Sequence, residues 1–107
     1  MIAVLFEADA VPEMQDRYFQ LAAELSPLLA ETNGFVSIER FQSLNTPGKI
    51  LSLSWWQDEE SVAEWKKNVC HQSAQKEGRE SIFAFYRIRV AQVIRDYSSE
   101  SGRPHHV

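Results

Sequence analysis

Hydrophobic and polar residues alternate along four segments of the chain, and a period of two residues is typical of β-strands. In the first segment, residues 2–9, Val4 and Phe6 lie on one face while Glu7 and Asp9 lie on the other. The same alternation predicts three further strands, over residues 35–44, 49–57 and 83–97. The pattern therefore predicts a four-stranded sheet.

The strand over residues 49–57 separates large apolar side chains from serines. Its two faces carry Leu51, Leu53 and Trp55 on one side and Ile50, Ser52, Ser54 and Trp56 on the other. Because Trp55 and Trp56 are adjacent, we expect one to join the core beneath the helices and the other to meet a partner or ligand. In the strand over residues 35–44, the alternation predicts one face made of Phe35, Ser37, Glu39 and Phe41.

Two other segments repeat apolar residues at helical spacing. The first begins at Pro12, which suits the first turn of a helix, and ends at Asn33-Gly34, a pair that supplies a left-handed exit. The second covers residues 58–68, with Asp58 as its N-cap. A short continuation or separate helix is expected over residues 71–78.

The predicted order is β-α-β-β-α-β, which is the ferredoxin-like α+β arrangement with both helices on one face of an antiparallel sheet. We expect this domain to cover residues 1–97 and a polar, flexible tail to cover residues 98–107. Two helices cover only one face of such a sheet, and the other face carries aromatic residues beside serine, arginine and glutamate. A second copy of the chain is the simplest cover for that face, so we expect a homodimer through the sheet.

The composition excludes several classes of protein. The 107 residues are 44% hydrophobic and 24% charged, an ordinary globular mixture that fits one domain. With 11 Lys and Arg against 15 Asp and Glu, the net charge of −4 provides no basic field for nucleic acid. The single cysteine, Cys70, excludes an intrachain disulfide, and no apolar run approaches the roughly 20 residues of a membrane span. We therefore expect a cytoplasmic protein that binds neither nucleic acid nor a membrane.

Strong catalytic and metal-binding motifs are absent from the sequence. His71, Gln75 and Arg79 are spaced four apart and would share one side of a helix. They form either a solvated helix edge or the polar lip of a pocket, where an imidazole can move a proton and a guanidinium can hold a phenolate or enolate. Because His71 has no second ligand at metal-binding spacing, no metal site is predicted.

Three further side chains also have a structural and a functional interpretation. Trp65 is either a core residue of its helix or a wall of a cavity in which a flat substrate stacks; both can hold. Arg87 and Arg89 either line a pocket or form salt bridges between subunits, to Glu39 or Glu7.

The chain resembles the antibiotic biosynthesis monooxygenase domain over about residues 1–97. The resemblance is carried by the segments GFVSIERFQS and SLSWWQDEESVAEWKKN, by the pattern W-x5-H-x3-Q-x2-GR, and by the final YRIRVA strand. It implies a dimeric α+β barrel with a cavity between helices and sheet in each protomer. It further implies a cofactor-independent monooxygenase acting on a small aromatic, phenolic or quinol-type substrate.

The resemblance also implies roles for individual residues. His71 and Arg79 are the expected catalytic residues, and Trp65, Gln75, Trp55 and Arg87 are the expected substrate-binding residues, with no metal and no cofactor. A haem-degrading branch of the family has a Trp on the second helix and a His ligand about ten residues later. Here Trp65 matches, but the ligand position falls on Gln75, which argues against haem.

Two other functions stay open from the sequence. One is a dimeric protein that binds a small aromatic molecule without transforming it, and the less favoured one is a haem-binding or haem-degrading relative. Oxygen uptake with naphthol and hydroquinone substrates distinguishes the first from an oxygenase, and a haem titration tests the second.

Overall fold

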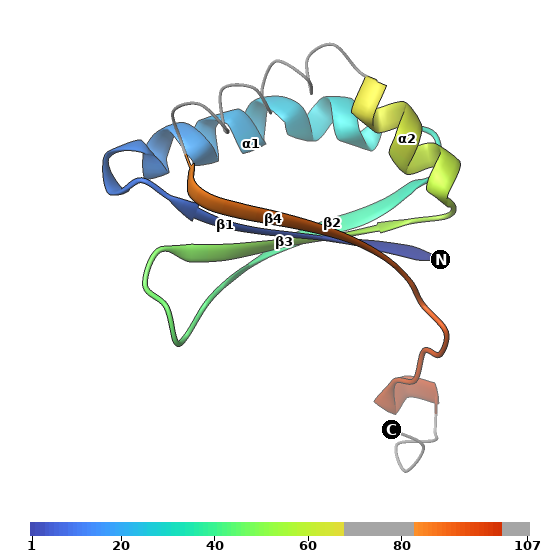
Figure 1. Cartoon of the computed structure of the whole chain (residues 1–107). Helices are drawn as coiled ribbons and strands as arrows, with labels where there is room; N and C mark the ends of the chain where they lie inside the picture. Colours follow the sequence, from blue (N-terminus) through green and yellow to red (C-terminus); the bar gives the residue numbers. More distant parts are fainter. Residues whose placement is uncertain (68–82, 102–107) are drawn as a thin grey trace.

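Four strands pair antiparallel into one sheet, and two helices lie together on one of its faces (Figure 1). The structure, a computed structural model, describes residues 1–67 and 83–101. The order of strands in the sheet is β2-β3-β1-β4, so β1 and β3 are central. The elements are β1 (Ile2–Ala10), the 3-10 turn η1 (Pro12–Met14), α1 (Gln15–Ala30), β2 (Phe35–Gln42), β3 (Lys49–Trp56), α2 (Glu59–Lys67), β4 (Phe83–Gln92) and the 3-10 turn η3 (Ser99–Ser101). This arrangement confirms the predicted ferredoxin-like α+β fold.

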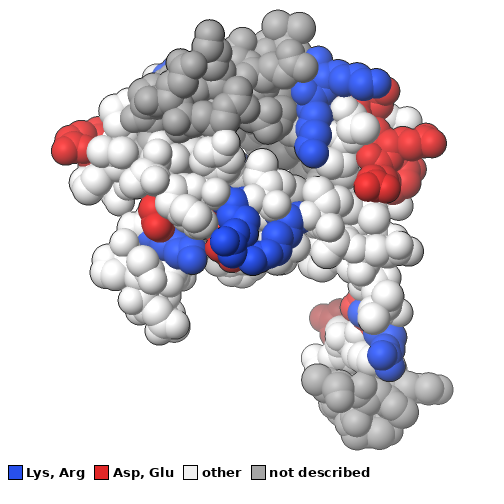
Figure 2. Space-filling model, in the orientation of Figure 1, with Lys and Arg blue, Asp and Glu red and all other residues white. Residues whose placement is uncertain are grey.

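The N-terminus of α2 forms as the sequence predicts. Asp58 Oδ1 accepts hydrogen bonds from both the backbone N–H and the hydroxyl of Ser61, each at 2.8 Å. These donors, the backbone N–H first, hold the pKa of the Asp58 carboxyl below its usual value. Figure 2 shows the charges separated along this helix, with acidic side chains in the first turn and lysines in the last, as the helix dipole favours.

Gly34, in the turn between α1 and β2, lies close to the start of α2. Gly34 has a φ of +87°, and its carbonyl accepts a hydrogen bond from the backbone N–H of Gln57 at 2.8 Å. A Cβ on Gly34 would collide with the side chain of Ser61 in α2. The left-handed angle predicted for Gly34 is therefore confirmed, but the helix itself ends earlier, at Ala30. Glycine is needed at position 34 for both backbone angle and space.

The hydrophobic core lies at the α2 end of the molecule. Its buried members are Leu29, Trp56, Val62 and Trp65, and Phe35 packs against them. The Phe35 and Trp56 rings meet edge to face at 5.3 Å between centroids. This cluster joins both helices to β2 and β3.

Two details of the sheet differ from the sequence prediction. The register of β2 on β3 shifts between Phe35 and Ser37, so that Phe35 faces the helices and does not share a face with Ser37 and Glu39. The predicted strand over residues 83–97 is shorter, because β4 ends at Gln92, opposite Ile2 where its partner strand begins. The helix predicted over residues 71–78 lies outside the described residues.

Candidate functional site

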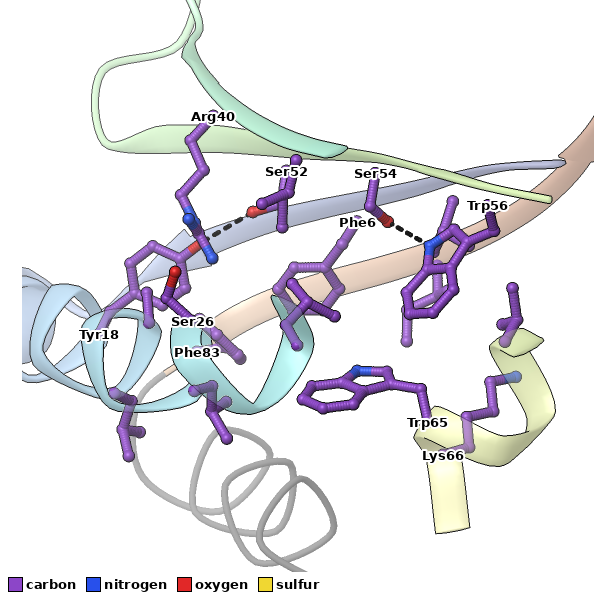
Figure 3. A pocket seen from close by; sticks show the side chains of 18 residues that line it. Phe6, Tyr18, Ser26, Arg40, Ser52, Ser54, Trp56, Trp65, Lys66 and Phe83 are labelled. Atoms are coloured by element: carbon purple, nitrogen blue, oxygen red, sulfur yellow. Dashed lines mark hydrogen bonds between the residues drawn. The ribbon is translucent and has the colours of Figure 1, made fainter. Parts of the chain in front are cut away.

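A cavity of about 190 Å³ lies between the sheet and the two helices (Figure 3). Its described lining comes from every strand and from both helices: Val4, Phe6, Tyr18, Leu21, Ala22, Leu25, Ser26, Leu29, Ile38, Arg40, Ser52, Ser54, Trp56, Val62, Trp65, Lys66, Phe83 and Ile88. An apolar cavity of about 150 Å³ is large enough to hold benzene. The space therefore suits a small cyclic molecule.

The serines of β3 create this space. Neighbouring strands align their helix-facing side chains in rows, and one row runs Arg40, Ser52, Phe6 and Ile88 while the next runs Ile38, Ser54, Val4 and Val90. In both rows β3 contributes a serine at a central strand, where a large apolar residue would fill the layer beneath the helices. The cavity is thus a consequence of small side chains at two alternate positions of one strand.

The polar groups of the cavity are hydrogen-bonded in two pairs. The Tyr18 hydroxyl and Ser52 Oγ are 3.0 Å apart, and the Trp56 indole N–H donates to Ser54 Oγ at 2.9 Å. All four side chains are buried. The pairs fix the orientations of two aromatic rings that border the cavity.

Aromatic rings form the wall around Tyr18. Phe83 meets Phe6 at 5.4 Å and Tyr18 at 5.5 Å between centroids, both edge to face. Trp65 and Trp56 lie toward the α2 end of the cavity (Figure 3). The site thus offers ring faces and edges on more than one side of a bound molecule.

Charged residues reach the cavity from β2 and α2. Arg40 and Lys66 line it, and the described lining contains no Asp or Glu. Within the described parts of the chain, no group of three or more His, Cys, Asp or Glu side chains could hold a metal ion. No helix among these residues is long and apolar enough to cross a membrane.

The residues predicted to form the site lie in different parts of the structure. Trp65 is buried, at 8% exposure, and also lines the cavity, whereas the stacking of a substrate on its ring stays a prediction. Trp56 rather than Trp55 lines the cavity. Trp55 and Arg87 lie on the sheet face away from the helices, which we call the open face.

The other selected residues, His71, Gln75 and Arg79, lie outside the described residues, as do Cys70, His105 and His106. Their predicted roles stay predictions.

The open face carries ion pairs within the protomer. Glu7 contacts Lys49 and Arg89, each at 3.5 Å, and the Arg87 guanidinium lies 5.7 Å from the centroid of the Phe85 ring. The predicted partnership of Arg89 with Glu7 therefore occurs inside one chain.

Four residues of the cavity were not predicted from the sequence: Tyr18, Arg40, Ser52 and Ser54. The serines had a signal, since they alternate on one face of a strand whose other face is apolar. Tyr18 and Arg40 had none, because their approach to the serines depends on how α1 and β2 pack around β3.

Comparison with known proteins places this fold in a family. The family model described as antibiotic biosynthesis monooxygenase matches residues 1–77. The chain belongs to the antibiotic biosynthesis monooxygenase family.

Two sequence relatives are similar over most of the chain. A protein of Pyricularia oryzae named jasmonate monooxygenase is 43% identical over 93 residues, which are 87% of this chain and 43% of that protein. This chain therefore spans less than half of that relative. The uncharacterized protein YqjZ of Bacillus subtilis is 28% identical over 93 residues, 87% of this chain and 79% of that protein.

Solved structures share the fold at low sequence identity. Rv0793 from Mycobacterium tuberculosis is similar with a TM-score of 0.80 at 12% identity, over 91% of this chain and 98% of that one. A conserved protein from Methanosarcina mazei is similar with a TM-score of 0.77 at 19% identity, over 85% and 90% of the two chains.

Proposed function

We propose that this family member is a monooxygenase that oxidises a small phenolic or quinol-type molecule bound in the cavity, without a metal or organic cofactor. The observation that carries the proposal is the cavity itself, walled by aromatic and aliphatic side chains and furnished with two hydrogen-bonded hydroxyl groups. The relative named jasmonate monooxygenase supports an oxygenase activity for the domain that the two proteins share.

The oxidation of a phenol to a quinone by O2 needs no external reductant, because the phenol itself supplies the electrons. A phenol with a free para position is the enol form of a ketone that has a CH2 group, and replacing the two hydrogens of that CH2 by one oxygen gives a quinone. Proton loss gives an electron-rich anion that reduces O2, a C–O bond forms, and cleavage of the O–O bond releases the second oxygen as water. The protein must then bind the substrate, accept a proton and stabilise the anion.

Residues of the segment that follows α2 are proposed for the chemical steps. His71 is suited to accept the proton, because imidazole titrates near neutral pH. Arg79 is suited to stabilise the anion, and Gln75 to bind a substrate oxygen. These assignments rest on the family resemblance and on residue chemistry.

Oxygen uptake tests the proposed activity. With a substrate that has a free para position, such as 1-naphthol, we expect the purified protein to consume one O2 per molecule and one atom of ¹⁸O2 to enter the quinone. A panel of further naphthols and hydroquinones is tested for O2 uptake alone. His71→Ala and Arg79→Ala should each lower the rate at least tenfold, whereas Lys67→Ala, on the exposed surface of α2, should not. Uptake equal to buffer across the panel would refute the oxygenase.

A binding protein without catalysis is the second candidate. The observation that favours it is that the described lining contains no His, Cys, Asp or Glu, the groups most used for proton transfer near neutral pH. Saturable binding of the same panel without oxygen uptake would support it. Haem is the less favoured candidate, because the position of the family's His ligand falls on Gln75 in this sequence.

We propose further that two protomers pair through their open faces. The centre of this face is apolar, with Leu51, Leu53 and Trp55 projecting from β3 and Phe41 still 42% exposed. Beyond β4 the chain leaves the sheet toward the open-face side, and Ile94 on that segment is 82% exposed (Figure 1). A second copy would cover both apolar features.

A single charge tests the pairing. Leu53 lies beside Glu39 across the strand pair, so a lysine at position 53 finds a neutralising neighbour in its own protomer but faces apolar surface in a dimer. We expect Leu53→Lys to shift the mass in solution from dimer to monomer. Ala23→Lys, the same charge on the exposed surface of α1, should leave the dimer intact. A monomeric wild-type protein would refute the pairing.

A further inference from the structure

Arg40 lies at the end of the cavity where the hydroxyl groups gather. It stands next to Ser52 in the register of β2 on β3, and Ser52 bonds to Tyr18 of α1. Figure 3 shows the Arg40 side chain extending from β2 toward Tyr18 and Ser26. A guanidinium and three hydroxyl groups, contributed by α1, β2 and β3, therefore border one end of a mostly apolar space.

The described neighbours of Arg40 leave its charge without a counterion. No carboxylate lies within 4.0 Å of it in the part of the chain that the structure describes, whereas Lys49 and Arg89 both pair with Glu7 on the open face. Glu39 of β2 and Glu7 of β1 face away from the cavity, since both belong to the open face. Arg40 is exposed on the edge strand β2, so its charge is accessible to a ligand, and a bound anionic group that excludes water would strengthen the ion pair.

The hydrogen-bonded pair of Tyr18 and Ser52 has one O–H group that can donate to such a ligand. Tyr18 and Ser52 each have one O–H, and a single hydrogen bond between the two oxygens uses only one of them. The other O–H can donate to a ligand oxygen near Arg40. A guanidinium presents two parallel N–H donors that match the two oxygens of a carboxylate, and a single such fork with one hydroxyl donor suits a monoanion.

We propose that the cavity binds a small monocarboxylic acid, with the carboxylate on Arg40 and the Tyr18–Ser52 pair and the cyclic body of the molecule directed toward Trp56 and Trp65. This inference rests on the proposed function and narrows its substrates to cyclic acids that carry an oxidisable phenol or quinol group. Arg40 is then a specificity-determining residue, since it selects the charged acid over neutral molecules of the same shape.

A matched pair of probes tests the carboxylate directly. 2-Naphthoate and 2-naphthamide have nearly the same shape and differ by one negative charge, and their binding to the full chain can be compared by titration calorimetry. We expect the acid to bind the wild-type protein at least about tenfold more tightly than the amide, as a charge-assisted bidentate pair provides.

Variants identify the cation. Arg40→Gln should bring the two affinities close together by weakening the acid alone, and Arg40→Lys should restore only part of the preference because it lacks the fork. Lys66→Gln is the matched control, since Lys66 also lines the cavity but from α2, and it should keep the preference. Circular dichroism of each variant verifies the fold.

Three results would overturn the inference. Equal affinity of wild-type protein for acid and amide removes the carboxylate preference while leaving a ligand cavity and the proposed function in place. Loss of the preference in Lys66→Gln but not in Arg40→Gln assigns the anion to the other end of the cavity. If neither probe binds, this inference is overturned, and oxygen uptake with neutral phenols then decides the proposed function separately. Oxygen uptake with neutral phenols should persist in Arg40→Gln, because Arg40 is proposed to select the carboxylate and not to take part in the oxidation.

Discussion

Replacing Gly34 by alanine should destabilise the protein more than its backbone angle alone explains. At a φ of +87° an alanine is in the left-handed region, which costs about 1–2 kcal/mol. In addition, the new Cβ would lie 2.6 Å from the Cβ of Ser61, against an optimal carbon separation of about 3.5–4.0 Å. Ser61 is buried and bonded twice to Asp58, so it has little freedom to move aside. We expect a total loss of about 3 kcal/mol or more in unfolding free energy.

A second glycine provides the control. Gly48 has nearly the same φ, +84°, but a Cβ there would meet only the end of the Gln15 side chain, at 3.2 Å. Urea unfolding of Gly48→Ala should therefore show the backbone cost of about 1–2 kcal/mol and no more. The double variant Gly34→Ala/Ser61→Gly should lose less than the sum of its single changes, because it removes the collision. Equal losses in Gly34→Ala and Gly48→Ala would refute the close approach of α2.

Two further predictions concern hydrogen bonds at the site and at the start of α2. Ser54→Ala leaves the buried Trp56 indole N–H without its acceptor and should lower the unfolding free energy by about 1–3 kcal/mol in urea, whereas Ser54→Thr, which keeps a hydroxyl, should lose less; equal losses would contradict the reasoning. Because folding lowers the pKa of Asp58, its stabilising contribution is present above the unfolded value of 3.8 and is lost as the pH falls through the lower folded value. Asp58→Asn, which can still accept the bonds from Ser61, should show a weaker loss of stability between pH 5 and pH 2 than the wild type, and parallel pH curves would contradict the assignment.

Local patterns in the sequence were sufficient to predict most of the fold. Asp58 caps α2 and Gly34 takes the left-handed angle because these features depend on residues a few positions apart. The shift of register near Val36 was not predictable, since the alternation of side chains continues through it. That one shift turns Phe35 from the open face into the core.

The candidate site was harder to predict than the fold. Adjacent tryptophans must point to opposite faces, but alternation alone does not say which face lies beneath the helices. On β3 the more apolar set, with Leu51 and Leu53, lies on the open face, and the set with the two serines lies beneath the helices. The contact of Tyr18 with Ser52 joins residues 34 positions apart, and no local pattern encodes it.

The side chains of one strand, β3, form part of both the cavity and the face of the proposed dimer. On β3 the large residues Leu53 and Trp55 point away from the helices, and the small residues Ser52 and Ser54 point toward them. Exchanging the two sets would fill the space beneath the helices and leave serines on the open face, which water can hydrate without a partner. The small residues that face the helices therefore leave space for the cavity, and the large residues opposite make the open face apolar, which supports the proposed dimer. If this reasoning holds, sequences of this fold with large apolar residues on the helix-facing side of β3 and polar ones opposite should have neither a cavity nor a sheet-to-sheet dimer.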